Sequence, residues 1–161
     1  MDSSSQPSAQ IEIRRTDLLT PVAGLLIGAL NAELEARYPE PGATFFRLDP
    51  DEVSEGSGAF FVAYLAAEPV GCGAVRLIKT AVAEIKRMYV APSVRGHGVG
   101  RRILAELEAA ARTLGVRRLV LETGPRQPEA IALYRRAGFV GIPLFGEYIS
   151  SDFSICMAKD L

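Results

Sequence analysis

The residues with the clearest chemical potential form a short glycine-rich run flanked by arginines. The run, RGHGVGR from Arg95 to Arg101, lies between a strand-like stretch at Ile85 to Val90 and a helix-like stretch that begins near Val99. Glycines let successive backbone N–H groups approach an anion without a Cβ atom in the way, and a helix N-terminus adds roughly half a positive charge. The run therefore predicts a bound phosphate or pyrophosphate.

The spacing of these glycines argues against two nucleotide-binding motifs. A dinucleotide fold requires G-x-G-x-x-G in a tight turn after its strand, whereas this run reads G-x-G-x-G and follows the strand only after Ala91 to Val94. A P-loop requires Gly-Lys followed by Ser or Thr, but Gly100 is followed by Arg101 and Arg102. A strand-to-helix turn without any ligand stays open as the structural alternative.

Three motifs in order along the chain resemble the GNAT superfamily of N-acetyltransferases. Arg95 to Gly100 matches the family's acetyl-CoA signature, Arg/Gln-x-x-Gly-x-Gly/Ala, at every defined position. Ala83 to Val90 resembles the family's fourth strand, and Ala130 to Phe139 resembles its last helix. The resemblance extends from about Val70 to Phe139, and the N-terminal part of the chain adds little to it.

The resemblance implies an α+β fold, in which a mixed, mostly antiparallel sheet is flanked by helices and a central parallel pair of strands splays apart. In the GNAT fold coenzyme A occupies that gap, and a bulge in the fourth strand frees backbone groups that would otherwise be paired. The implied co-substrate is acetyl-CoA, without a metal. Its implied contacts are Met88, Tyr89, Val90, Arg95, Gly96, His97, Gly98, Val99, Gly100, Arg101, Gln127 and Tyr134.

Glu84 is the candidate general base for deprotonating an amine. Desolvation in an otherwise apolar-to-basic strand would raise its pKa toward neutrality. Residues 83–85 (AEI) resemble the opening of this strand in histone-acetylating GNATs, where the glutamate acts as the base through water. The structural alternative is a solvated edge glutamate paired with Lys86 or Arg76, and Glu122 in the next strand is a competing base.

Tyr134 is the candidate general acid for the departing thiolate, because a phenol can donate a proton to a less basic sulfur. The sequence LY at 133–134, followed by GF at 138–139, reproduces the pattern in which a GNAT tyrosine fills this role. The backbone N–H of Met88 would stabilise the oxyanion. A core tyrosine with a hydrogen-bonded hydroxyl is the structural alternative.

Two residues depart from a simple assignment. Gln127 stands where many GNATs have an asparagine that contacts pantetheine, seven residues before the tyrosine. His97, the one histidine of the chain, lies within the glycine run, so we expect it to flank the pyrophosphate rather than transfer protons.

The acceptor is predicted to be a primary amine of a small molecule, peptide or protein that attacks the thioester directly in a ternary complex. GNATs build the acceptor pocket from the first helix with its following loop and from the C-terminal strands. Acidic residues in the first of these regions suit a cationic amine, whereas Arg37 or Arg76 could anchor a carboxylate. Candidate acceptor contacts are Arg37, Tyr38, Phe45, Arg76 and Glu122.

A catalytically silent CoA-binding regulatory module is the alternative from a different functional class, because a fold does not dictate an activity. The presence of both Glu84 and Tyr134 favours the enzyme.

The composition limits the classes of protein to which this chain can belong. The 161 residues, 48% of them hydrophobic and 23% charged, suit one domain at 11–161 after a flexible tail at 1–10. A net charge of -1 argues against nucleic acid as the main partner, and no run approaches the about 18 apolar residues that span a membrane. Cys72 and Cys156 suggest buried thiols rather than a disulfide framework, which favours the cytoplasm. The sequence leaves open whether the protein forms a homodimer.

Periodicity and turn signals define the elements that must position these residues. Strands are expected at 11–14, 59–65, 70–78, 84–90, 118–122 and 153–157, and helices at 21–37, from near 99 to near 115, and at 128–137. Thr20 followed by Pro21 is typical of a helix start. The strand–helix–strand order from Glu84 onward indicates a right-handed parallel crossover joined to an antiparallel N-terminal meander.

Overall fold

The computed structural model describes residues 10–43 and 46–161. Apart from Gln10, the expected N-terminal tail lies outside these ranges, as does Phe45. The strands are β1 (Ile11–Arg15), β2 (Gly58–Leu65), β3 (Glu68–Lys79), β4 (Val82–Val90), β5 (Arg118–Thr123), β6 (Val140–Ile142) and β7 (Ile155–Asp160). The helices are α1 (Pro21–Arg37), α2 (Val99–Thr113) and α3 (Pro128–Arg136), with short 3-10 turns at Pro50–Val53, Pro92–Val94 and Gly146–Tyr148.

All seven strands form one mixed sheet in the order β1-β2-β3-β4-β5-β7-β6. The pairing is antiparallel except between β4 and β5, which run parallel and are joined through α2. This arrangement confirms the predicted fold class, with its parallel pair inside a mostly antiparallel sheet.

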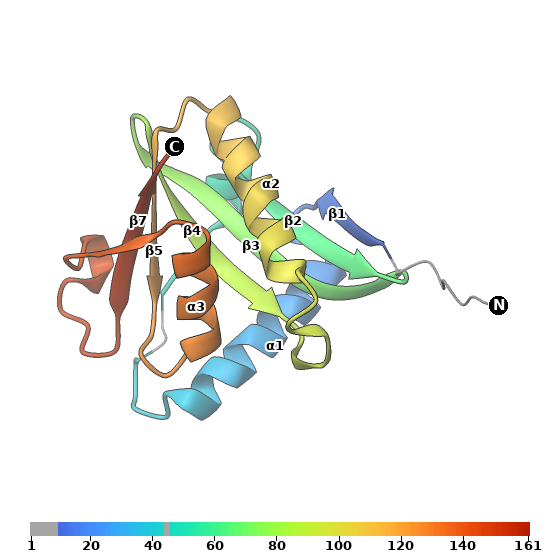
Figure 1. Ribbon diagram of the computed structural model, residues 1–161, viewed down its shortest axis with the longest axis horizontal. Coiled ribbons are helices and arrows are strands. Elements are labelled where there is room, and N and C mark those ends of the chain that lie inside the picture. Colours follow the sequence, from blue (N-terminus) through green and yellow to red (C-terminus); the bar gives the residue numbers. More distant parts are fainter. Residues whose placement is uncertain (1–9, 44–45) are drawn as a thin grey trace.

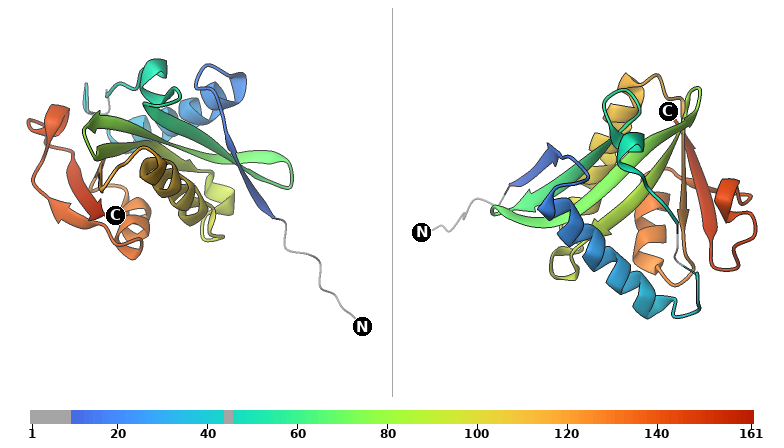
Figure 2. Two further views of the ribbon diagram at one scale, coloured as in Figure 1. Left: turned by 90° about the horizontal axis from the view of Figure 1, so that it is seen from above. Right: turned by 180° about the vertical axis from the view of Figure 1, so that it is seen from behind.

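The helices cover both faces of the sheet (Figures 1 and 2). Helix α1 packs on one face through Ala23 and Leu26, in a small cluster with Phe60 and Val62 of β2. Helices α2 and α3 lie on the other face, where the apolar stripe of α2 enters the main core. Burial of these apolar stripes is the principal driving force that holds the helices on the sheet.

Helix starts follow the expected chemistry. The Thr20 hydroxyl caps α1 by accepting from the backbone N–H of Ala23, and Pro21 occupies the first helical position. Proline fits there because its missing N–H would have no partner in the first turn anyway. The predicted bounds of α1 are therefore confirmed, and α3 also begins at its predicted proline, Pro128.

A bulge interrupts β4 in the middle of the sheet. The register with β3 passes from the pair Cys72–Tyr89 to the pair Ala74–Lys86, so Arg87 and Met88 together oppose one residue. Arg87 has φ +58°, the left-handed conformation that non-glycine residues rarely adopt. The bulge expected from the family resemblance is confirmed.

The C-terminal region differs from the sequence expectation. The closing strand is β7 at Ile155–Asp160, two residues later than expected at its start, and its charged end still pairs with β5 through Lys159 and Asp160. Charged residues at a strand end conceal the alternation on which the prediction rests. The short strand β6 was not predicted, because three residues are too few to show a periodicity.

Two further expectations concern the cysteines and the length of the helices. Cys72 and Cys156 are both buried free thiols, as predicted. Among the helices at residues 10–43 and 46–161, none has the length and apolar character needed to cross a bilayer.

Candidate functional site

The central cleft opens where β4 and β5 stop pairing. Their ladder joins Val82–Ile85 to Arg118–Leu121 and ends there, so the rest of β4 separates from β5. A cleft of about 820 Å³ lies beyond this point. It is lined by every residue that the family resemblance implied as a cofactor contact, namely Met88, Tyr89, Val90, Arg95, Gly96, His97, Gly98, Val99, Gly100, Arg101, Gln127 and Tyr134.

The glycine run forms a backbone cradle at one end of the cleft. Gly96 and Gly98 have φ of +86° and +85°, and Gly98 is the residue immediately before the first turn of α2. Left-handed conformations of this kind suit glycine and bring the N-terminal backbone of α2 to the wall of the cleft. Gly100 has a packing role instead, because a Cβ atom there would lie 2.9 Å from Cδ2 of Leu133 on α3.

Arg95 holds the cradle to the rest of the protein. Its Nη2 atom lies 2.6 Å from Glu33 Oε1 on α1, and its Nε donates to the Val90 carbonyl oxygen at 2.9 Å. Glu129 on α3 lies 3.8 Å from Nη1. Arg95 therefore links both walls of the cleft, whereas Arg101 and His97 are exposed at its rim.

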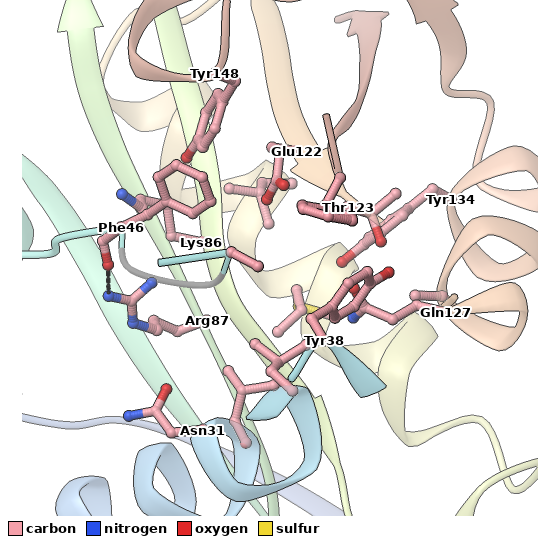
Figure 3. Close-up of a pocket in the computed structure, with 17 residues that line it drawn as sticks. Asn31, Tyr38, Phe46, Lys86, Arg87, Glu122, Thr123, Gln127, Tyr134 and Tyr148 are labelled. Carbon is pink, nitrogen blue, oxygen red and sulfur yellow. Dashed lines mark hydrogen bonds between the residues drawn. The ribbon is translucent and has the colours of Figure 1, made fainter. Parts of the chain in front are cut away.

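A second, smaller pocket of about 100 Å³ adjoins the larger cleft, and Figure 3 shows the residues that line it. It shares Leu30, Met88, Gln127, Ala130 and Tyr134 with the larger cleft, so the two hollows meet at these residues. The remaining wall is largely aromatic and charged. It contains Tyr38, Phe46, Tyr148, Phe153, Lys86, Arg87 and Glu122, together with Asn31, Leu34, Ala43, Ile85 and Thr123.

Glu122 is the carboxyl group of this pocket. It follows Leu121, the last residue of β5 that pairs with β4, so it lies where the strands have already separated. Burial is the main reason that the pKa of Glu122 rises to about 7, and the hydrogen bond from Ser154 Oγ at 2.6 Å partly opposes this rise. A carboxyl with that pKa can gain or lose a proton near neutral pH.

The neighbouring Thr123 carries an unsatisfied polar group. Its Oγ1 atom is buried and has no hydrogen-bond partner within residues 10–43 and 46–161. Buried hydroxyls normally have a partner, because leaving one unpaired is unfavourable. Thr123 also lines the pocket, so an acceptor molecule could supply that partner.

Glu84 lines neither hollow. It is 1% exposed, its Oε1 atom accepts from Arg76 Nε at 3.0 Å and Nη2 at 2.8 Å, and Tyr148 Oη donates to its Oε2 at 2.5 Å. Arg76 also contacts Glu52. The pairing with Arg76 agrees with the structural alternative, but Glu84 is buried on a central strand rather than solvated at an edge.

The pair predicts a structural effect of Glu84→Gln. Removing one partner of a fully buried ion pair destabilises a protein by about 3–5 kcal/mol, and we expect about 2 kcal/mol here because Arg76 retains Glu52. Denaturant unfolding measures the change. Asp160→Asn, which breaks the exposed Arg118–Asp160 pair, is the matched control and should change stability by less than about 0.5 kcal/mol. Equal stability of the two variants would contradict the structural role.

Tyr134 stands between the two hollows. It is 5% exposed and packs edge-on against Phe139, with ring centroids 5.9 Å apart. Its hydroxyl points into the smaller pocket (Figure 3). Burial raises the pKa of Tyr134 above its ordinary value, and the charge of Glu122 acts in the same direction, so the phenol stays protonated at neutral pH.

The end of α1 is held onto the turn between β5 and α3. Arg126 makes a bidentate ion pair with Glu40 at 2.8 and 2.9 Å, and its backbone N–H donates to the Tyr38 hydroxyl at 2.8 Å. Arg37 Nη1 donates to the Arg126 carbonyl oxygen at 3.0 Å. Tyr38 crosses the turn so closely that a Cβ atom on Gly124 would lie 1.9 Å from its hydroxyl. One wall of the pocket is therefore preformed.

The candidate acceptor contacts are only partly brought together. Tyr38 and Glu122 line the smaller pocket, whereas Arg37 and Arg76 line neither hollow, and Phe45 lies outside the described residues. Lys86 and Arg87 line the smaller pocket as well, although no sequence motif indicates them. Two adjacent cations at the centre of a buried strand were the available signal.

Comparison with known proteins agrees with this architecture. A family model described as the Acetyltransferase (GNAT) family matches residues 27–139. An IAA acetyltransferase from Azospirillum brasilense is 36% identical over 152 residues, covering 94% of this chain and 98% of that protein. A solved structure from Klebsiella pneumoniae, named as an acyl-CoA N-acyltransferase, is 33% identical with a TM-score of 0.79, covering 94% of this chain and 97% of that one.

A GNAT family acetyltransferase from Elizabethkingia anophelis, solved with acetyl-CoA bound, shares the fold at a TM-score of 0.66 and 21% identity, over 94% of this chain and 98% of that one. The sheet, the strand gap and these matches together define a class of enzyme, the acyltransferases that act from an acyl-CoA. The chain belongs to the GNAT family of acetyltransferases.

Proposed function

We propose that this enzyme transfers the acetyl group of acetyl-CoA to a primary amine, by direct attack within a ternary complex. The observation that carries the proposal is the junction of the two hollows at Met88, Gln127 and Tyr134. A thioester that enters from the larger cleft and an amine that enters from the smaller pocket would meet there. No covalent acyl-enzyme is then needed, because the two reactants are brought into direct contact.

The larger cleft fits acetyl-CoA in both volume and chemistry. Its volume of about 820 Å³ falls within the roughly 300–1,000 Å³ that ligand sites occupy. The cradle of Gly96 and Gly98 at the start of α2 would receive the pyrophosphate. Since β4 is not paired with β5 beyond Ile85, the backbone from Met88 to Val90 would be available to the pantetheine arm.

The smaller pocket would supply the base. We assign that role to Glu122, because it lines the pocket and Glu84 does not. Its pKa of about 7 leaves roughly half of the carboxyl groups ionised at neutral pH, which is enough to accept a proton from a bound ammonium ion. Burial among aromatic side chains favours this exchange by excluding bulk water.

The remaining steps follow the same geometry. The amine nitrogen forms a bond to the thioester carbon, the Met88 backbone N–H stabilises the oxyanion, and the carbon–sulfur bond then breaks. The nitrogen loses one proton to Glu122 before it attacks and a second one to solvent on forming the amide, and Glu122 then releases its proton to solvent. The Tyr134 hydroxyl lies at the junction and would give its proton to the thiolate, regaining one from solvent.

Acetyl-CoA affinity should depend on the cradle. Gly98→Asp is expected to weaken acetyl-CoA binding at least tenfold, because it adds bulk and negative charge beside the pyrophosphate. Calorimetry measures the affinity. Gly115→Asp is the matched control, because Gly115 has a similar φ of +77° but lies at the other end of α2. Comparable weakening in both variants would attribute the effect to backbone strain rather than to the cradle.

The direct test of the proposal is an amine-dependent assay. Purified enzyme with acetyl-CoA and a panel of primary amines should release CoA thiol only when a suitable amine is present, in equal amounts with an N-acetylated product. IAA, which appears in the name of the Azospirillum relative, is tested beside this panel as a separate acceptor. Intersecting initial-rate patterns are expected for a ternary complex. Tight acetyl-CoA binding with no turnover of any panel member would indicate a CoA-binding module instead.

A further inference from the structure

The smaller pocket holds two cations, in addition to the carboxyl group that the mechanism uses. Lys86 and Arg87 on β4 both line it, and the side chain of Lys86 is 3% exposed. Figure 3 shows Arg87 and Lys86 on one side of the pocket, with Glu122 and Tyr134 toward the other. The pocket therefore has a cationic end and a carboxyl end.

Arg87 is the cation without a carboxylate partner. Within residues 10–43 and 46–161 its one side-chain hydrogen bond runs from Nη2 to the Phe46 carbonyl oxygen at 2.5 Å, and it forms no ion pair. Arg37, Arg76 and Arg95 each form an ion pair, whereas Arg101 and Arg136, which line the larger cleft, are exposed to solvent. A half-buried guanidinium without a counterion is unfavourable unless an anion arrives to pair with it.

Lys86 contributes less than Arg87. Its Nζ atom donates to the Arg47 carbonyl oxygen and lies 3.4 Å from Glu147 Oε2, so its charge is partly neutralised. Arg87 also has the geometry for the task, because a guanidinium can grip a carboxylate with two parallel hydrogen bonds. The positive charge of Lys86 then supports an anion bound by Arg87.

The backbone conformation at Arg87 is also unusual. The bulge in β4 places this arginine at φ +58°, a conformation that is strained for a residue with a side chain. Strain of this kind is typical of residues that a binding site requires in a particular orientation. Here the conformation accompanies a guanidinium that lines the pocket.

We propose that the acceptor is a small amino carboxylic acid, with its carboxylate held by Arg87 and its amine directed to Glu122. This assignment rests on the proposed N-acetyltransferase function. A pocket of about 100 Å³ is well below the roughly 300–1,000 Å³ of sites for drug-sized ligands, which favours a molecule of amino-acid size. The aromatic wall of Phe46, Tyr148 and Phe153 suits an apolar side chain, and Thr123 Oγ1 is available to the polar part of the acceptor.

The test compares each acceptor with its own primary amide. The probes are L-alanine, L-methionine and L-phenylalanine, their amides, and the carboxylate-free amines ethylamine, phenethylamine and putrescine. Rates are compared per unprotonated amine, because amidation also lowers the basicity of the amine. For wild type we expect kcat/KM for at least one amino acid to exceed that of its amide by about 100-fold, which is about 2.7 kcal/mol.

Arg87→Gln should abolish this discrimination. The expected change is a rise of at least 30-fold in KM for the amino acid, with less than a threefold change in kcat/KM for its amide and unchanged acetyl-CoA affinity. Arg87→Lys should retain part of the preference, because lysine keeps the charge but cannot make the two parallel hydrogen bonds of a guanidinium. Arg118→Gln, at an exposed ion pair, is the matched control. Circular dichroism melting confirms that each variant is folded.

The outcomes separate the two proposals. The amino-acid assignment is wrong if amines without a carboxylate are acetylated at the same rate as the amino acids. It is also wrong if Arg87→Gln and Arg87→Lys both keep the wild-type preference. In either case the acetyltransferase function stands. If Arg87→Gln does not fold, the preference of wild type and of Arg87→Lys decides the assignment. If wild type binds acetyl-CoA but acetylates no amine, both proposals are contradicted.

Discussion

Glu122→Gln is expected to lower kcat/KM by roughly 10²–10⁴-fold at pH 7, the usual contribution of a positioned general base. Glutamine keeps the shape of the side chain and can still accept from Ser154, but it cannot take a proton. The loss should shrink as pH rises, because an amine with a pKa of about 10.4 is increasingly deprotonated by solvent. Steady-state rates of CoA release with one identified acceptor, from pH 6 to pH 10, measure both effects.

Glu147→Gln is a suitable control for that experiment. Glu147 is a nearby carboxylate that contacts Lys86 but does not line the pocket. It should leave the rate within about threefold of wild type, because Glu147 is 40% exposed and its contact with Lys86 is long, at 3.4 Å. A wild-type rate in Glu122→Gln at pH 7 would remove Glu122 from the mechanism.

Tyr134→Phe is expected to lower kcat by roughly 10²-fold or more, which is about 2.7 kcal/mol in the barrier. The change removes one hydroxyl and keeps the ring that packs against Phe139, so the fold and the acetyl-CoA affinity should be little altered. Pre-steady-state rates separate the chemical step from product release. The matched control is Tyr64→Phe, which removes a hydroxyl from β2 at a residue that lines neither hollow. Equal rates in wild type, Tyr134→Phe and Tyr64→Phe would mean that Tyr134 is a core residue without a catalytic role.

Much of the larger cleft was predictable from sequence because its parts are local. The glycines at 96 and 98, the start of α2 at Val99 and the tyrosine of α3 lie in short motifs whose spacing has a backbone explanation. Three-dimensional structure adds the distances and the volume. The residues themselves could be named in advance.

The choice between Glu84 and Glu122 could not be made from sequence. Both lie on the two parallel central strands, and both sit among apolar neighbours. Their difference comes from register, because Glu84 pairs with Val120 inside the closed part of the ladder and Glu122 lies beyond its last pair. It also comes from partners far away in sequence, since Tyr148 and Arg76 both bind Glu84.

The acceptor pocket was less predictable for the same reason. Its walls come from α1, the segment around Phe46, the bulge of β4 and the turn at Tyr148, which are brought together only by the folded sheet. Arg87 reaches the pocket because of the bulge, and no periodic pattern reveals the direction of a bulged side chain. Arg37 and Arg76 were reasonable candidates by charge, but in the fold they pair with Glu129 and Glu84.

The most direct test of the account is the pH dependence of kcat/KM in wild type, Glu122→Gln and Glu84→Gln. This quantity reports ionisations of the free enzyme and of the free acceptor, and a base must be deprotonated to act. With a pKa of about 7 for Glu122, wild-type kcat/KM should rise between about pH 6 and pH 8. We expect Glu84→Gln to keep the inflection near pH 7 and the levelling above it. Glu122→Gln should lose that inflection and rise continuously toward the pKa of the acceptor amine. An inflection near pH 7 that persists in Glu122→Gln but disappears in Glu84→Gln would contradict the account and make Glu84 the base.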